Sequence, residues 1–250
     1  MIKCGLYVDG DNLAGNGGFG IDYLRLREFA EYHGALLRAN VYFSIDEEAE
    51  ENPEIKRKRS EFRRILRSFG YHVFTKPIKK YVQVDGSTTA KANVDLEIAV
   101  DIMMQARNLD HILLATSDGD FVRVVNAVQD MGRRIEVLAF RNVSGRLIEE
   151  ADAFHNGFFI PGLIGVDEGR HIGYMHHAFA EKGFGFLTYR TGFGRNDLRD
   201  DVFVHMSDVE NMTSNLAFGR LIGNHNPLEF SLETMPDGRV KAVKVHPIKE

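Results

Sequence analysis

The sequence predicts an α/β fold, a mostly parallel sheet flanked by helices, followed by a small all-β barrel. Over residues 2–156, apolar strand-like runs alternate with helix-periodic segments, which is the pattern of a parallel sheet with helices on both faces. Beyond residue 156 the long helical segments stop, and short strand-like runs alternate with glycine turns. The change of pattern predicts two domains of different class.

Each element of the first domain has its own signal. Predominantly apolar, strand-like runs predict strands over residues 2–8, 35–43, 111–116 and 134–140. Apolar residues at helical spacing predict helices over residues 21–34, 54–70, 94–107 and 120–132. Residues 157–170 are rich in glycine and include Pro161, so we expect a linker there. The domains are then expected at 1–156 and 171–250.

Composition limits where the protein can act. No apolar run approaches the roughly 18 residues that a membrane helix needs, so no membrane partner is expected. The lone cysteine, Cys4, and the early polar residue Asp9 indicate neither disulfides nor a signal peptide, which predicts a cytoplasmic protein. A net charge of −5 argues against binding nucleic acid by overall charge, so any such binding must be local.

Acidic residues occur where predicted strands end. Asp9 follows the first strand, and Asp118 and Asp120 follow the strand over 111–116; Asp95 opens a helix on its inward face. The carboxyl ends of parallel strands meet at one edge of a sheet, so these carboxylates are expected to converge. Crowded carboxylates need a cation, and oxygen ligands without Cys or His favour Mg²⁺ or Mn²⁺. Such an ion can activate a water against a phosphodiester.

A purely structural interpretation of the same acids stays open. Ser117 and Asp118 are good helix N-caps, and Asp120 suits the positive end of a helix. The histidines give no metal signal in the sequence, because none falls in a ligand-spaced cluster. We therefore expect His33, His72 and His111 to be ordinary structural or surface residues.

A basic segment stands out in this acidic protein. The helix predicted over residues 54–70 reads EIKRKRSEFRRILRSFG, with an apolar side and a glycine at its end. One interpretation is an ordinary solvated helix face, and the other is a surface that contacts phosphates. The candidate phosphate contacts are Lys56, Arg57, Arg63 and Arg64.

Three motifs of the first 155 residues, LYVDGDNL, KANVDLEIAVD and LLATSDGDFVRVVNAVQDMGRRIEVLAF, together resemble the NYN domain. This is a branch of the PIN-like ribonucleases, and the resemblance is to its LabA-like subgroup. It implies a PIN-like parallel sheet and Asn12 as a polar partner beside the metal. It also implies that the catalytic, metal-binding acids are Asp9, Asp95, Asp118 and Asp120.

The first of these motifs also resembles a second family. LYVDGDN is similar to the strand-Asp-x-Asp motif of haloacid-dehalogenase-type phosphatases. That would make Asp9 a nucleophile and Asp11 an acid. Those enzymes usually have Thr or Val shortly after the pair, whereas this chain has Leu13 and Ala14.

Aromatic residues alternate along two strand-like segments of the second domain, EKGFGFLTYR and DVFVHMS. Side chains alternate across a strand, so Phe184 and Phe186 share one face, as do Phe203 and His205. Gly183 and Gly185 are expected to keep the backbone between the aromatic residues accessible. Outward aromatic rows are typical of surfaces that stack single-stranded nucleic acid, although aromatic residues also fill the cores of small barrels.

The motifs KGFGFL, DVFVHMS and DGRVKAVKV resemble a cold shock domain over about residues 170–248. That family is an OB-fold that binds single-stranded RNA or DNA. His177 and Ala178 stand where the family usually has an exposed Trp and a Phe. The resemblance implies a binding platform of Lys182, Phe184, Phe186, Phe203 and His205.

Together these patterns predict a metal-dependent endoribonuclease whose first domain cuts single-stranded RNA while the second holds it. Single-stranded DNA is a possible second ligand for the same surface. The alternatives are a non-catalytic RNA-binding regulator and, with less support, the phosphatase. The patterns predict no oligomeric state.

Overall fold

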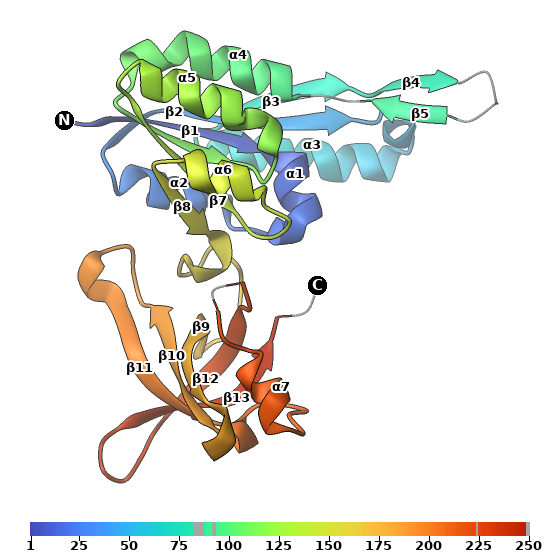
Figure 1. The fold of residues 1–250 in the computed structure, drawn as a ribbon. Helices are drawn as coiled ribbons and strands as arrows, with labels where there is room; N and C mark the ends of the chain where they lie inside the picture. The colour runs from blue at the N-terminus through green and yellow to red at the C-terminus, as the bar shows by residue number, and fades with distance from the viewer. Residues whose placement is uncertain (83–87, 92–93, 224, 249–250) are drawn as a thin grey trace. The chain divides into compact units, whose positions relative to one another are not determined.

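The computed structural model describes residues 1–82, 88–91, 94–223 and 225–248 of the 250-residue chain (Figure 1). Ala92 and Asn93 of the KANVDLEIAVD motif therefore lie outside the described residues. The chain divides into two compact units. The first comprises residues 1–19 and 23–155, and the second comprises residues 20–22 and 156–250.

The first unit is built on a six-stranded sheet in the order β3-β2-β1-β6-β7-β8. Neighbouring strands from β3 to β7 pair in parallel, as the alternating pattern of the sequence predicts. A separate two-stranded antiparallel sheet is formed by β4 (Lys79–Val82) and β5 (Thr88–Lys91). The bounds in the main sheet are β1 Lys3–Asp9, β2 Ala35–Ile45, β3 His72–Pro77, β6 His111–Ala115, β7 Arg134–Ala139 and β8 Ala153–Asn156.

Helices cover both faces of this sheet (Figure 1). On one face α4 and α5 pack over the central strands, and their buried side chains Ile98, Ile102 and Val125 join those of Ile112 and Val137. Each such side chain contributes about 1.5–3 kcal/mol when fully buried. The helices are α1 Gly10–Leu13, α2 Tyr23–Glu31, α3 Pro53–Ser68, α4 Asp95–Gln105, α5 Val122–Asp130 and α6 Gly145–Glu150.

The second unit is a closed five-stranded barrel in the order β10-β11-β13-β12-β9. Its strands pair antiparallel except at the closing β11–β13 contact, which is parallel. A short helix, α7 (Asn215–Gly219), places Phe218 in the barrel core beside Val204 and Phe230. The strands are β9 Arg170–Phe179, β10 Phe184–Arg190, β11 Leu198–His205, β12 Leu228–Thr234 and β13 Val240–Pro247. The predicted fold class, a helix-flanked parallel sheet followed by an all-β barrel, is confirmed.

The segment expected to be a linker contains regular structure. Residues 157–159 form a 3₁₀ turn that Asn156 caps, and the backbone N–H of Asp22 donates to the carbonyl oxygen of Leu163 at 2.9 Å. The domain limits read from the sequence stay a prediction.

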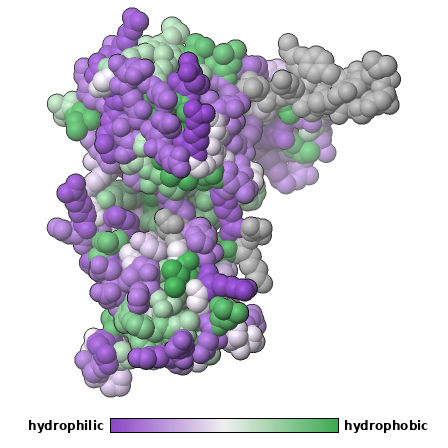
Figure 2. Space-filling model, viewed as in Figure 1, coloured by the Kyte–Doolittle hydropathy of each residue, from purple (hydrophilic) through white to green (hydrophobic). Residues whose placement is uncertain are grey.

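Hydrophilic residues predominate on the visible surface, with hydrophobic patches that include one over α4 (Figure 2). The exposed side chains of Leu96, Val100 and Met104 belong to that helix. Among the described residues, no helix is both long enough and apolar enough to cross a membrane.

Candidate metal centre and aromatic surface

Asp9 is a buried carboxyl group at the carboxyl end of β1. Only 4% of the residue is exposed, and its Oδ1 accepts a hydrogen bond of 3.1 Å from the backbone N–H of Asn12, which caps α1. Burial raises the pKa of Asp9 to about 7 against the lowering effect of that bond, and the charges of Asp95, Asp11 and Asp118 raise it further. The ionised form of Asp9 is thus poorly stabilised by the protein itself.

Asp95, the first residue of α4, belongs to the same electrostatic cluster. Its side chain is half-buried, and burial together with the charges of Asp118 and Asp120 raises its pKa. Lys76 acts in the opposite direction, but its Nζ lies 2.6 Å from Glu97 Oε1, so this cation is already paired. The fold therefore places Asp118 close enough to raise the pKa of both Asp9 and Asp95, and Asp120 close enough to raise that of Asp95.

Asp118 also acts as a helix cap, as the structural interpretation expects. Its Oδ1 accepts the backbone N–H of Asp120 at 2.9 Å, at the start of the 3₁₀ turn Gly119–Phe121. Asp118 is half-buried and Asp120 is exposed. Capping uses one carboxylate oxygen of Asp118 and is compatible with a second ligand on the other.

Asn12 joins the two loops that carry the acids. Its Oδ1 accepts hydrogen bonds from both the backbone N–H and the Oγ of Ser117, each 2.8 Å long. Because β1 and β6 are neighbours in the sheet, these bonds connect the loop after β1 to the loop after β6. Because Ser117 occupies the Asn12 Oδ1, we assign these two residues the role of holding the acid-bearing loops together.

The four carboxylates do not form a tight shell. Within the described part of the chain, the one group of three or more His, Cys, Asp or Glu residues with ligand atoms within 4.8 Å of one another is His33, His111 and Glu136. Like charges repel, and the acids would approach more closely around a cation. Their donor set, all oxygen and with Asp9 buried, fits a hard ion such as Mg²⁺ or Mn²⁺.

His33 and His111, which show no ligand spacing in the sequence, lie close together in the structure, with Glu136 beside them. His33 lies in the turn after α2, His111 begins β6 and Glu136 lies in β7. The three residues are far apart in the chain, and only the folded sheet brings them together. Their linear spacing therefore carried no signal. His72 is exposed on β3, where its ring stacks with Phe74.

The basic helix is α3, capped by Asn52. Arg63 is engaged by Glu50 at 2.9 Å and is half-buried, while Arg64 lies 3.8 Å from Glu61 and is exposed. Lys56 and Arg57 are also exposed. Arg63 is thereby less available to a ligand than the other three, and phosphate contact by this helix stays a prediction beside the solvated-face interpretation.

On the barrel, aromatic residues form two cross-strand rows. Phe184 pairs with Phe179 of β9 and with His205 of β11. Phe186 pairs in the same way with His177 and with Phe203, and the three phenylalanines named in the sequence analysis are half-buried. The alternate positions, including Leu187, Val202 and Val204, lie in the barrel core. The aromatic rows therefore lie outside that core.

The rings of the two rows touch one another. Phe184 and Phe203 stack with centroids 5.8 Å apart, and Phe179 and Phe184 are 4.8 Å apart. Lys182 places its Nζ 5.9 Å from the centroid of Phe179. A hollow of about 650 Å³ beside them is lined in part by Phe184, Phe186, Phe203, Arg199 and Arg239.

The sequence analysis missed Phe179 and His177 as members of this surface. Their alternation in MHHAFA is a signal that could have found them. The expected role of the glycines was also wrong. Gly183 adopts a positive φ of 69°, and Gly185 is buried, where a Cβ would lie 2.7 Å from the carbonyl oxygen of His177. These glycines allow the turn and the close approach of β9, and they do not expose the backbone.

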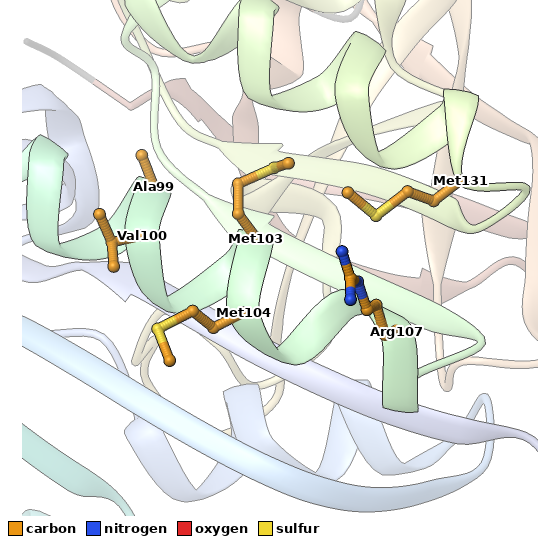
Figure 3. Close-up of a pocket in the computed structure, with 6 residues that line it drawn as sticks. All are labelled: Ala99, Val100, Met103, Met104, Arg107 and Met131. Carbon is orange, nitrogen blue, oxygen red and sulfur yellow. The ribbon is translucent and has the colours of Figure 1, made fainter.

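A separate apolar groove of about 610 Å³ lies along α4 (Figure 3). It holds none of the predicted site residues. Its lining consists of Ala99, Val100, Met103 and Met104 from α4, Arg107 from the 3₁₀ turn 106–108 that follows it, and Met131 at the end of α5.

The first unit is a helix-flanked parallel sheet with acids at the carboxyl ends of β1 and β6. The model of the NYN domain family matches residues 3–161, so the chain belongs to that family. The chain is 26% identical over 155 residues to the low amplitude and bright protein LabA of Synechococcus elongatus, a match that covers 60% of this chain and 80% of that protein.

A solved structure gives the same result for the fold. A protein of unknown function from Vibrio parahaemolyticus is 28% identical, with a TM-score of 0.51, and the match covers 62% of this chain and 92% of that one. The family match ends at residue 161, before β9 begins. The barrel is therefore established as a five-stranded fold, and its resemblance to a cold shock domain stays a prediction.

Proposed function

We propose that this protein is a metal-dependent endoribonuclease that cuts single-stranded RNA at the acid edge of the sheet and holds it on the aromatic face of the barrel. The observation that carries the proposal is the buried Asp9 carboxyl, whose pKa is raised to about 7 with Asp95 and Asp118 among the causes. A divalent cation would relieve this repulsion. Membership of the NYN family supports nuclease chemistry at these acids.

The residues of the chain would share the work at this edge. Asp9, Asp95, Asp118 and Asp120 would hold Mg²⁺ or Mn²⁺, and the bonds between Asn12 and Ser117 keep the two acid-bearing loops at a fixed spacing. When bound, the ion would supply an activated water and offset the charge that develops on the scissile phosphate.

The barrel would supply most of the affinity for the strand. Each base has a face that can stack, and stacking on an aromatic side chain contributes about 1–3 kcal/mol per base. The rows around Phe184 and Phe186 offer several rings on adjacent strands, with Lys182 beside them. Because the protein carries a net charge of −5, stacking has to contribute more than overall charge. The same chemistry accepts single-stranded DNA, which would bind without being the expected substrate.

The test is cleavage of a labelled single-stranded RNA in Mn²⁺ by wild-type protein, Asp118→Asn and Asp101→Asn. We expect Asp118→Asn to cut at least about a hundredfold more slowly, because the ion and its transition-state stabilisation are lost. Asp101 is a matched control on α4, since it accepts a 2.7 Å hydrogen bond from the Tyr42 hydroxyl that an asparagine can also accept.

The outcomes separate the three functions. Equal cleavage by wild type and Asp118→Asn would contradict the proposal. Tight RNA binding by wild type without any Mn²⁺-dependent cleavage would identify a non-catalytic RNA-binding protein. Turnover of a small phosphomonoester would support the phosphatase, which Leu13 and Ala14 after the first motif disfavour.

A further inference from the structure

We propose that His33, His111 and Glu136 form a second metal site, for a divalent transition ion such as Zn²⁺, at the amino end of the parallel sheet. The proposal does not depend on the proposed ribonuclease function. It concerns a different set of ligands at the opposite end of the strands from the acids.

The first argument for the site is that the three residues lie close together. One ligand atom from each lies within 4.8 Å of the others, and the Nε2 of His111 is 3.4 Å from Glu136 Oε1. His111 begins β6 and Asp118 follows the end of that strand, so at about 3.3 Å per residue the two sites are roughly 20 Å apart. They cannot share one ion.

The second argument is that the ring nitrogens here are poorly satisfied. Only 5% of the His111 side chain is exposed, yet neither ring nitrogen makes a hydrogen bond of good geometry within the described part of the chain, and the Nε2 has only the 3.4 Å contact with Glu136 Oε1. The buried Nε2 of His33, whose ring centroid lies 4.7 Å from that of His111, likewise makes no hydrogen bond among the described residues. An unsatisfied buried polar atom costs about 1–3 kcal/mol, and a metal ion would give these nitrogens a partner.

The carboxylate of Glu136 is already held in place. His155 Nε2 lies 2.6 Å from Oε2, and Arg134 Nε lies 2.6 Å from Oε1. In metal sites, a ligating carboxylate is typically hydrogen-bonded by a further residue that does not itself touch the ion. His155 can fill that role for Glu136. The Arg134 side chain is 55% exposed, so it can move into solvent and leave Oε1 to an ion. In the metal-free protein Arg134 takes the place of that cation.

The donor set selects the class of ion. Two imidazole nitrogens and one carboxylate oxygen, with a water at the fourth position, suit Zn²⁺ and not Mg²⁺. The ring of Phe29, 5.1 Å from that of His155, helps to exclude water.

The experiment measures Zn²⁺ and Co²⁺ binding to the full-length protein, by competition with a chelator and by the visible absorption of bound Co²⁺. We expect one high-affinity ion per chain in wild type, in His72→Gln and in Asp118→Asn. His33→Gln and His111→Gln should each weaken binding about a hundredfold or more, and His155→Gln about 10- to 100-fold. Arg134→Gln should bind at least as tightly as wild type, because it removes a competing cation.

Circular dichroism checks that each variant folds. If His111→Gln fails to fold, His33→Gln decides, because His33 lies half-buried in a turn. The proposal is overturned if wild type binds neither ion at micromolar concentration, or if binding survives unchanged in the His33 variant. A loss of binding in Asp118→Asn with retention in His33→Gln would likewise overturn it, by assigning the ion to the acid edge. None of these readouts depends on RNA cleavage.

Discussion

Two buried carboxyl groups occupy opposite ends of the same sheet, and their ionisation is shifted in opposite directions. Asp9, at the carboxyl end, has a pKa raised to about 7 by burial, with the charges of its acidic neighbours adding to that effect. Burial would also raise the pKa of Glu136, but His111, His155 and Arg134 hold it far below its usual range. Burial alone therefore does not decide the state of a carboxylate.

The neighbours of the two groups account for the difference. At Glu136 the protein supplies its own cation and hydrogen-bond donors, so the carboxylate stays ionised without any ligand. At Asp9 the neighbours are further carboxylates, which favour the protonated form, and the ionised form would gain most from the cation that we propose at this edge. The two sites also differ in the ion that we propose for each, since the acid edge offers only oxygen ligands and the other end offers imidazole nitrogens.

The largest effect is expected from Asp9→Asn in metal-free protein. A pKa raised from 3.8 to about 7 means that ionised Asp9 destabilises the folded state by up to about 4 kcal/mol above pH 7. The penalty vanishes below about pH 3, where the group is mostly protonated in both states. Asp9→Asn should therefore raise the free energy of unfolding at pH 8 in EDTA and leave it nearly unchanged near pH 3. Urea unfolding at both pH values measures this free energy. A variant that is no more stable than wild type at pH 8 would show that ionised Asp9 does not destabilise the folded protein.

Glu136→Gln is expected to act with the opposite sign. The folded pKa of Glu136 is lowered, so its stabilising effect is present above the unfolded value of 4.5 and is lost as the pH falls below it. Removing the charge should cost about 3 kcal/mol at pH 7, at the low end for a broken buried pair because Arg134 can reach solvent. The difference from wild type should shrink at pH 3. If wild type and Glu136→Gln have equal free energies of unfolding at pH 7, the proposed contrast between Glu136 and Asp9 does not hold.

A smaller effect is expected from the barrel. Phe186→Ala should weaken binding of single-stranded RNA by about 1–3 kcal/mol, because one stacking face is lost. Leu216→Ala is the control, since this residue is 68% exposed on α7 and lies outside the aromatic rows. Fluorescence anisotropy with a short labelled RNA measures both affinities. A loss shared equally by both variants would argue against the aromatic surface as the binding site.

The acid edge could be predicted from sequence because a local rule governs it. Asp9 and Asp118 each follow an apolar strand, and the ends of parallel strands meet regardless of the details of packing. Alternation similarly placed Phe184 and Phe186 on one face of a strand. These predictions needed only the period of the pattern and the order of the elements.

Other features depend on contacts that no local pattern records. The strands β3 (HVFTKP) and β8 (AFHN) were missed because they mix polar with apolar residues, and the six residues of α6 are too few to show a helical period. The group of His33, His111 and Glu136 was missed because its members come from three separate elements. The hydrogen bond of Asn12 with Ser117 was also missed, because the two residues are 105 positions apart in the chain; the place of Asn12 beside a metal stays a prediction.

The most direct test of the central claim is cleavage of a labelled single-stranded RNA by wild-type protein in Mg²⁺, Mn²⁺, Zn²⁺ and EDTA. We predict cleavage with Mg²⁺ or Mn²⁺, none in EDTA, and little with Zn²⁺, which suits the nitrogen-rich end of the sheet. Cleavage that continues undiminished in EDTA would contradict a metal-dependent site at Asp9, Asp95, Asp118 and Asp120.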